Sequence, residues 1–239
     1  MILSVKNTKR QIEIPPQLCY NNYTNKSTPK GNAMKFLLIN GSPHKNGTTN
    51  AALSEVASVL EREGAEYEII HVGHLGVRGC LGCYSCRKLG KCVIDDEVNE
   101  VAEKFKECDG IIIGSPVYYA APAGALISFL DRLFYSSGFD KRDKIGAAVV
   151  VARRGGCTAA FDVLNKYFTI SGMPLVSSTY WNQVHGQTAD DALLDLEGMQ
   201  CMRNLARNAI FLAKSVALGR EALGLPECEK GERTNFIRK

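Results

Sequence analysis

Residues 34–50 read MKFLLINGSPHKNGTTN and contain, in order, a short apolar run, a polar loop and the start of an amphipathic segment. The run 36–39 is wholly apolar, which is typical of a strand buried on both faces of a parallel sheet. After the loop, apolar residues recur at helical spacing as far as Gly64, and glycine commonly ends a helix. The stretch therefore predicts a strand–loop–helix unit that opens a domain at Met34.

The same alternation of strand and helix continues along the chain. With helical segments between them, further strands are predicted from apolar runs at 66–72, 110–116, 144–152 and 173–182. A long amphipathic helix is expected from about 189 to 218. Because each strand is followed by a helix, we predict an α/β fold with a doubly wound, five-stranded parallel sheet and helices on both faces. In such sheets, ligands bind beyond the carboxyl ends of the strands.

One domain is expected, with an appendage at each end. Residues 1–33 are polar and rich in Asn, Lys, Thr and Pro, and they predict an N-terminal arm without a fold of its own. The domain is assigned to 34–220, with a cysteine-rich loop at 79–92, and residues 221–239 are a polar tail. No internal repeat and no second apolar core interrupt this reading.

The composition is that of an ordinary globular protein, with 45% hydrophobic and 23% charged residues in a chain of 239. The net charge is only +4 and the basic residues are scattered, which argues against a nucleic-acid-binding surface. No apolar run approaches the roughly 20 residues that a membrane-spanning helix needs, and the N-terminus does not resemble a secretory signal. We therefore expect a cytoplasmic protein, with neither nucleic acid nor a membrane as its partner.

The polar loop before the first helix lacks the spacing of two common nucleotide-binding motifs. It matches neither G-x-G-x-x-G nor G-x-x-x-x-G-K-[ST], since five residues separate Gly41 from Gly47 and no Lys precedes Thr48. Hydroxyls, backbone N–H groups and the positive end of a helix dipole suit one phosphate, although Ser, Thr and Asn also cap helices. The candidate phosphate-binding residues are Ser42, Lys45, Asn46, Gly47, Thr48 and Thr49.

Two later loops at the same edge of the predicted sheet carry residues suited to a flat ring. Aromatic side chains after the third strand can flank a ring or pack in the core, and this stretch is Pro116, Val117, Tyr118 and Tyr119. After the fourth strand come two arginines, which can supply positive charge or form a solvated pair, and two glycines, which allow close backbone approach. These residues are Arg153, Arg154, Gly155 and Gly156.

Four of the nine cysteines lie in GCLGCYSCRKLGKC, residues 79–92. Without an export signal, disulfides are disfavoured. Zinc prefers C-x2–4-C pairs held apart by a longer span, and a redox dithiol needs only two thiols. An iron–sulfur cluster accepts soft thiolates at intervals of three, so a cluster is the favoured interpretation, with zinc and redox thiols as alternatives. The candidate ligands are Cys80, Cys83, Cys86 and Cys92.

Together, the opening stretch, the cysteine stretch and GSPVYYAAPAGALISFLDR resemble the flavodoxin-like NAD(P)H-dependent FMN reductases, and within them the iron–sulfur flavoproteins. The resemblance runs from 34 to about 219. It implies FMN, with its phosphate in the loop 42–49 and its ring against 116–119. The C-x2-C-x2-C-x4–7-C motif of that branch implies a 4Fe–4S cluster on the four cysteines. The resemblance also implies a homodimer or homotetramer with shared FMN sites, and a redox partner such as ferredoxin.

These features predict an FMN-dependent oxidoreductase in which electrons pass between flavin and cluster, with NAD(P)H as an electron donor. His185, after the last predicted strand, is a candidate catalytic proton donor or else a structural hydrogen-bond donor. Three alternatives remain open. They are an NAD(P)H-dependent FMN or quinone-type reductase without a cluster, an electron carrier with no substrate of its own, and a zinc-stapled binding module.

Overall fold

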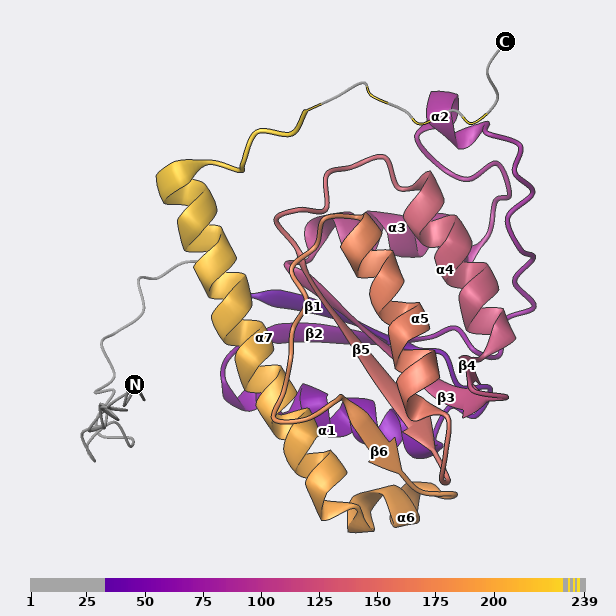
Figure 1. The fold of residues 1–239 in the computed structure, drawn as a ribbon, viewed down its shortest axis with the longest axis vertical. Coiled ribbons are helices and arrows are strands. Elements are labelled where there is room, and N and C mark those ends of the chain that lie inside the picture. Colours follow the sequence, from indigo (N-terminus) through magenta and orange to yellow (C-terminus); the bar gives the residue numbers. More distant parts are fainter. Residues whose placement is uncertain (1–32, 230–231, 233, 235, 237–239) are drawn as a thin grey trace, which may run out of the picture. The chain divides into compact units, whose positions relative to one another are not determined.

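The computed structural model describes residues 33–229, 232, 234 and 236. The arm predicted at 1–33 lies outside the described residues except for Ala33, and the predicted tail is described only in part. Figure 1 shows the described part as helices packed on both faces of a sheet. The helices are α1 (Thr48–Arg62), α2 (Cys86–Leu89), α3 (Glu97–Glu107), α4 (Gly124–Ser136), α5 (Cys157–Ile170), α6 (Ala189–Leu194) and α7 (Leu196–Leu223).

A six-stranded sheet forms the centre of the domain, and five of its strands are parallel in the order β2-β1-β3-β5-β6. With the short β4 set aside, this is the 2-1-3-4-5 order of flavodoxin-like sheets. The direction of winding reverses between β1 and β3, which makes their carboxyl ends the expected ligand edge. The strands are β1 (Lys35–Asn40), β2 (Glu66–His71), β3 (Gly110–Tyr118), β4 (Ala121–Pro122), β5 (Ile145–Ala152) and β6 (Gln183–His185).

Alternate side chains of the central strands enter two separate cores. In β1, Phe36 and Leu38 pack into the core that contains α1 and α7. Leu37 and Ile39 point the other way, into the core shared with α3, α4 and α5. Because both faces are covered, the strand is apolar throughout instead of alternating, which explains why the run 36–39 could be recognised as a buried parallel strand.

The strand β4 pairs antiparallel with the end of β3 and forms a hairpin beside the carboxyl edge of the sheet. The two residues at its tip, Tyr119 and Ala120, have positive φ angles of 49° and 59°. A two-residue hairpin turn of this kind is normally occupied by Asn-Gly, because larger side chains are strained there. Strained backbone of this sort often accompanies a functional site.

The fifth strand differs from its predicted position at 173–182. Only an isolated bridge forms there, between Leu175 and Gly146, and regular pairing with β5 begins later, at Gln183. The prediction was wrong because the segment loops away from β5 after the bridge at Leu175, and it rejoins β5 only at Asn182, whose carbonyl accepts from the N–H of Val150 at 3.0 Å. The side-chain amide of Asn182 donates to the carbonyl of Ala148 at 3.1 Å, so a side chain takes the place of a backbone partner.

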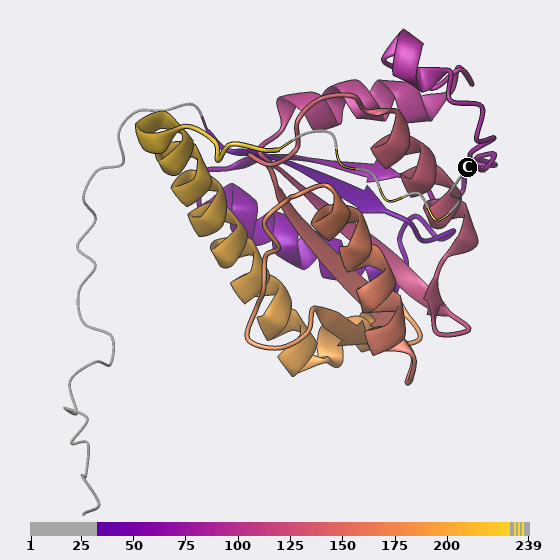
Figure 2. The same ribbon diagram turned by 45° about the horizontal axis from the view of Figure 1, so that its top comes forward.

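The long helix expected from 189 to 218 is divided at Asp195 into α6 and α7. The Asp195 carboxylate accepts from the backbone N–H of Gly198 at 2.9 Å and from that of His185 at 2.7 Å. Aspartate competes for backbone donors in this way and so favours helix starts over helix interiors. The second helix, α7, then continues to Leu223 and packs beside α1 on the same face of the sheet (Figure 2).

Candidate functional site

A cleft of about 380 Å³ opens at the carboxyl ends of the strands, where the topology places a ligand site. Its volume falls within the range of small-molecule sites, roughly 300–1,000 Å³. Three of the loops that were singled out in the sequence meet here. Of the predicted cofactor-binding residues, those that line the cleft are Ser42, Gly47, Thr48, Thr49, Pro116, Val117, Tyr118 and Arg153.

The loop between β1 and α1 is held in shape by a buried asparagine, Asn40. Its side-chain oxygen accepts from the backbone N–H of Ser42 at 3.0 Å, and its amide donates to the carbonyl of Lys45 at 3.2 Å. From β2, the Nε2 atom of His71 donates to the Ser42 carbonyl at 2.6 Å. These contacts turn the loop toward the cleft. Sequence reasoning missed Asn40 and His71, although a polar residue that ends a wholly apolar strand is a signal for such a role.

The N-terminus of α1 opens onto the cleft without a side-chain cap. Gly47 precedes the helix in an extended conformation, and no side chain accepts from the first helical N–H groups. The Ser42 hydroxyl accepts instead from the backbone N–H of His44 at 3.1 Å, within its own loop. The capping role that the sequence left open is therefore not taken. Free N–H groups, the helix dipole and the Thr48 and Thr49 hydroxyls together suit an anion.

The two tyrosines after β3 are placed differently. Tyr118 lines the cleft with 45% of its surface exposed, whereas Tyr119 is fully exposed at the hairpin tip and does not line it. Gly156 also serves the hairpin: a Cβ atom on this residue would lie 3.0 Å from the Cα of Ala120. Its φ of +92° likewise suits glycine.

The remaining predicted residues of the flavin site do not line the cleft. Lys45, Asn46, Arg154 and Gly155 are exposed and outside the cleft lining. Sequence reasoning also missed a fourth wall, formed after β6, which no pattern in that polar stretch could reveal. The cleft residues that had not been predicted are His44, Val151, Ala152, Gly186, Gln187 and Thr188.

His185 lies next to the cleft wall but does not line the cleft. Its Nδ1 atom is 3.6 Å from the Asp195 carboxylate, and its Nε2 atom is 4.0 Å from the sulfur of Cys157. Burial raises the pKa of the Cys157 thiol, as expected for a packed cysteine and opposite to an activated one. These contacts give His185 a structural setting, and its catalytic role stays a prediction.

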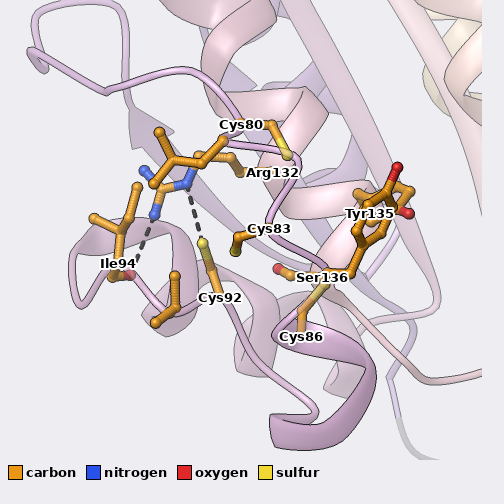
Figure 3. A pocket seen from close by; sticks show the side chains of 11 residues that line it. Cys80, Cys83, Cys86, Cys92, Ile94, Arg132, Tyr135 and Ser136 are labelled. Atoms are coloured by element: carbon orange, nitrogen blue, oxygen red, sulfur yellow. Dashed lines mark hydrogen bonds between the residues drawn. The ribbon is translucent and has the colours of Figure 1, made fainter.

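A second pocket lies beneath the loop 79–92, and all four cysteines of the motif line it (Figure 3). The loop lies outside the sheet, and its only helix, α2, contacts α4 (Figure 2). Gly82 and Gly90 turn the chain with φ angles of +63° and +71°, which glycine adopts without strain. The further residues of the pocket are Leu81, Tyr84, Val93, Ile94, Arg132, Tyr135 and Ser136.

A buried arginine on α4, Arg132, ties the two ends of the cysteine loop together. Only 1% of its surface is exposed. Two of its nitrogens donate to both oxygens of Asp96 at 2.6 and 2.7 Å, a bidentate pair, and the guanidinium also donates to the carbonyl of Arg78 at 3.3 Å. Its Nε atom lies 3.3 Å from the sulfur of Cys92, to which it donates. Figure 3 shows this bond and another to the carbonyl of Ile94.

The thiols of the loop differ from the buried thiols of the core. The backbone N–H of Ser85, and then its side chain, lower the pKa of the exposed Cys83 thiol. By contrast, burial raises the pKa of Cys108 to about 11. Thiolates are the form that binds metal, so Cys83 is better suited than Cys108 to act as a metal ligand.

The four sulfurs surround one space without forming a mononuclear site. Across residues 33–229, 232, 234 and 236, no three His, Cys, Asp or Glu side chains are grouped so that they could hold one metal ion. A zinc site needs its sulfurs about 2.3 Å from a single centre, whereas a four-iron cluster takes each thiolate on a different iron. An unpartnered hydroxyl, that of the buried Ser136, also faces the pocket. Four soft thiol ligands around one pocket are a donor set that suits an iron–sulfur cluster.

The same described residues contain no helix that is long and apolar enough to cross a bilayer. What the chain does provide is a doubly wound sheet, an uncapped helix at its ligand edge and a separate pocket of soft ligands. These features define a flavodoxin-like α/β protein with a site for a phosphorylated ligand.

Comparison with known proteins gives the family. The family described as NADPH-dependent FMN reductase matches residues 34–188. An iron-sulfur flavoprotein of Methanocaldococcus jannaschii is 34% identical over 191 residues, which cover 77% of this chain and 99% of that protein. Another, from Methanosarcina thermophila, is 29% identical over 192 residues, or 79% of this chain and 100% of that protein. The chain therefore belongs to the NADPH-dependent FMN reductases and, within them, to the iron–sulfur flavoproteins.

Solved structures confirm the fold. RosB, solved with bound 8-demethyl-8-formylriboflavin-5'-phosphate, aligns with a TM-score of 0.63 at 16% identity and covers 86% of this chain and 93% of its own. A flavodoxin-like, WrbA-like protein from Agrobacterium tumefaciens aligns with a TM-score of 0.53 at 14% identity, covering 77% and 98%. The predicted α/β, flavodoxin-like class is thus confirmed, as is the class of flavin-dependent oxidoreductase that the family defines.

Proposed function

We propose that this oxidoreductase binds FMN in the cleft at the carboxyl edge of the sheet. One observation carries the proposal: a single cleft joins the uncapped N-terminus of α1 to the aromatic end of β3. The phosphate would be held by the first N–H groups of α1 with the hydroxyls of Thr48 and Thr49. The ring would lie against Val117 and Tyr118, on the side of the cleft away from that helix.

The chain's own residues bind and orient the flavin and supply charge near it. Bound FMN accepts two electrons, as from NADPH, and can release them one at a time. Arg153 lines the cleft and brings positive charge to it, which favours the anionic reduced ring. Val151 and Ala152, at the end of β5, form an apolar wall of the cleft, which would limit the access of water to the ring from that side.

We further propose that Cys80, Cys83, Cys86 and Cys92 hold a 4Fe–4S cluster, which would exchange single electrons with the flavin. All four side chains line one pocket, and the fourth cysteine is local to the loop, so one segment can supply the complete ligand set. The M. jannaschii and M. thermophila relatives carry the name iron-sulfur flavoprotein, which supports the proposal.

Anaerobic purification, followed by iron, sulfide, zinc and FMN assays on one sample, tests both proposals. We expect one FMN and about four irons and four sulfides per chain. Protein reconstituted with flavin and iron that retains neither would overturn both. Zinc in place of iron and sulfide would overturn the cluster proposal and leave the flavin site standing.

A second candidate function is an NADPH-dependent FMN or quinone-type reductase without a cluster. It is favoured by the family model that matches residues 34–188, whose description names NADPH and FMN. This alternative predicts rapid bleaching of the flavin by NADPH and unchanged turnover after Cys83→Ala. The cluster proposal predicts instead that transfer to a one-electron acceptor, such as a ferredoxin, is lost in Cys83→Ala.

We also propose a homodimer or homotetramer in which neighbouring protomers complete each cleft. Two observations support this arrangement. Large aromatic side chains are exposed, namely Tyr119 at the hairpin tip, next to the cleft residue Tyr118, and Trp181 before β6. The proposed flavin and cysteine sites also lie toward opposite ends of α4, and the rise of 1.5 Å per residue places about 18 Å between Gly124 and Ser136. A neighbouring protomer could bring its own cysteine loop closer to the flavin than this. Light scattering of the FMN-loaded protein tests the oligomeric state.

We also propose that the protein works in the cytoplasm, where a reducing environment keeps thiols free.

A further inference from the structure

The last two turns of α4 contribute two buried polar side chains to the cysteine pocket. Arg132 and Ser136 are four residues apart, so they lie one turn apart on the same face of the helix. Their exposed fractions are 1% and 4%. In Figure 3, the Ser136 hydroxyl points into the space that the sulfur atoms surround, and Arg132 reaches Cys92 from the other side.

The Ser136 hydroxyl lacks a hydrogen-bond partner among the described residues. A serine inside a helix normally donates to the carbonyl four residues earlier. The next residue, Ser137, does this: its hydroxyl donates to the carbonyl of Leu133. An unpaired buried hydroxyl destabilises a fold, so the orientation of Ser136 toward the pocket calls for a partner that the described residues do not supply.

The carboxylate of Asp96 accepts only some of the hydrogen bonds that Arg132 can donate. The bidentate pair with Asp96 uses the two terminal nitrogens and leaves the Nε–H to point at sulfur. Buried charge beside a metal pocket acts strongly, because the surroundings screen it less than water does. From within the protein, the Nε–H of Arg132 is therefore directed at a sulfur and the Ser136 hydroxyl at the space between the sulfurs, whereas Cys80 and Cys83 lie on the exposed side of the loop.

We infer that Arg132 and Ser136 donate hydrogen bonds to sulfur atoms of the bound cluster and raise its reduction potential. The inference rests on the cluster proposed above. One-electron reduction adds one negative charge to the cluster, and hydrogen bonds to its sulfurs stabilise that added charge. The two side chains are positioning residues: they set the potential and the orientation of the site, and they are not iron ligands.

The test is a potentiometric titration of the cluster in the FMN-loaded protein, comparing wild type with Ser136→Ala and Ser137→Ala. Ser137 is a matched control, because its hydroxyl is satisfied within the helix and does not line the pocket. For Ser136→Ala we expect a shift of about tenfold in the one-electron equilibrium toward the oxidised cluster, or about 59 mV. Ser137→Ala should keep the wild-type potential with full iron content.

Two variants of the arginine extend the test. Arg132→Lys keeps the charge but loses the planar fork, and Arg132→Met loses both. We expect the potential to fall in the order wild type, Lys variant, Met variant. Iron and FMN contents, measured on each sample, report whether the variant has folded.

The outcomes separate the two levels of the argument. A wild-type protein that holds FMN but no iron or sulfide overturns the cluster itself, and this inference with it. A fully loaded Ser136→Ala protein with the potential of Ser137→Ala overturns the hydroxyl's role alone. In D2O, the iron–sulfur stretching bands of wild type should also shift, because donor hydrogens exchange, and the shift should shrink in Ser136→Ala.

Discussion

The cleft at the sheet edge and the pocket under the cysteine loop are built in opposite ways. The cleft is made from strand ends and a helix start, so its walls are fixed by the sheet topology and by the buried Asn40. The cysteine pocket lies outside the sheet, in a loop whose only regular element is the four-residue α2. A ligand for the cleft meets a site that is largely preformed, while a cluster must complete the site it occupies.

The difference extends to what holds each region in place. Around the cleft, backbone hydrogen bonds between strands supply the rigidity. In the cysteine loop, one buried side chain joins Arg78 at the start to Asp96 at the end. A removed flavin should therefore leave its cleft intact, whereas a removed cluster should leave the loop held by a few side-chain hydrogen bonds, among them those of Arg132 and those of Asn99 to the backbone of Cys92.

The largest effect is expected from removing two cluster ligands. In Cys83→Ala combined with Cys86→Ala, iron and sulfide should fall from about four per chain to near zero, since a 4Fe–4S cluster uses four thiolates. FMN should stay at one per chain, because the cleft does not depend on the loop. Colorimetric iron and sulfide assays with flavin absorbance measure both. Cys228→Ala, an exposed thiol outside the pocket, is the control, and an unchanged iron content in the double variant would contradict the assignment.

A carboxylate placed at the phosphate site should break the cleft alone. Thr48→Glu puts a negative charge at the uncapped start of α1, so FMN should bind at least about tenfold more weakly, a change of 1.4 kcal/mol or more. Fluorescence titration of the apoprotein with FMN measures the affinity. Asn46→Glu adds the same charge to the same loop outside the cleft lining, and equal losses in the two variants would move the phosphate elsewhere.

A smaller effect should separate the two tyrosines of the hairpin. Tyr118→Ala removes a side chain that lines the cleft, and we expect FMN affinity to fall several-fold, about 1 kcal/mol, with a change in flavin fluorescence. Tyr119→Ala alters only an exposed tip and should leave the isolated site unchanged. A larger loss in Tyr119→Ala than in Tyr118→Ala would show that the tip reaches a flavin, and in that case a flavin of a neighbouring protomer.

The smallest effect is expected from Asp191, which holds the fourth wall of the cleft. Backbone N–H groups of Thr188, and then of Gln187, lower its pKa from the ordinary value of 3.8. A carboxyl whose folded pKa is lowered stabilises the fold above that ordinary value, and this stabilisation is lost as the pH falls through the lowered pKa. Asp191→Asn should therefore lower Tm slightly at pH 7, and the difference from wild type should vanish once the pH has fallen through the lowered pKa of Asp191. A Tm difference that persists undiminished in acid would assign the effect to packing.

The contrast between the two regions also decides what could be predicted from sequence. The strands β1, β3 and β5 were found because strands buried on both faces must be apolar throughout, and the loops at their ends followed from topology. The last strand could not be placed in the same way. Between Gly146 and Val150, β5 advances four residues (146 to 150), while its neighbour advances eight, from Leu175 to Gln183. Such looping out leaves no periodic signal, nor does the side-chain contact of Asn182 with the carbonyl of Ala148 that accompanies it.

Within the sites, local motifs were predictable and distant partners were not. The spacing of the four cysteines predicts a shared site, and in the structure all four line one pocket. Arg132 lies 40 residues after Cys92, so nothing in the cysteine stretch points to it. Likewise, the exposed fractions that separate Tyr118 from Tyr119 depend on the hairpin turn, since the two residues are adjacent and chemically identical.

The contacts by which Arg132 joins Arg78 to Asp96 also have a consequence for biogenesis. During synthesis the cysteines leave the ribosome before α4 does, because Arg132 follows Arg78 by 54 residues. Until α4 has been made and has docked, the two ends of the loop have no common anchor. If the four cysteines hold a cluster, as proposed, we expect its insertion to follow the docking of α4, so that an assembly factor would meet a loop whose ends are already joined.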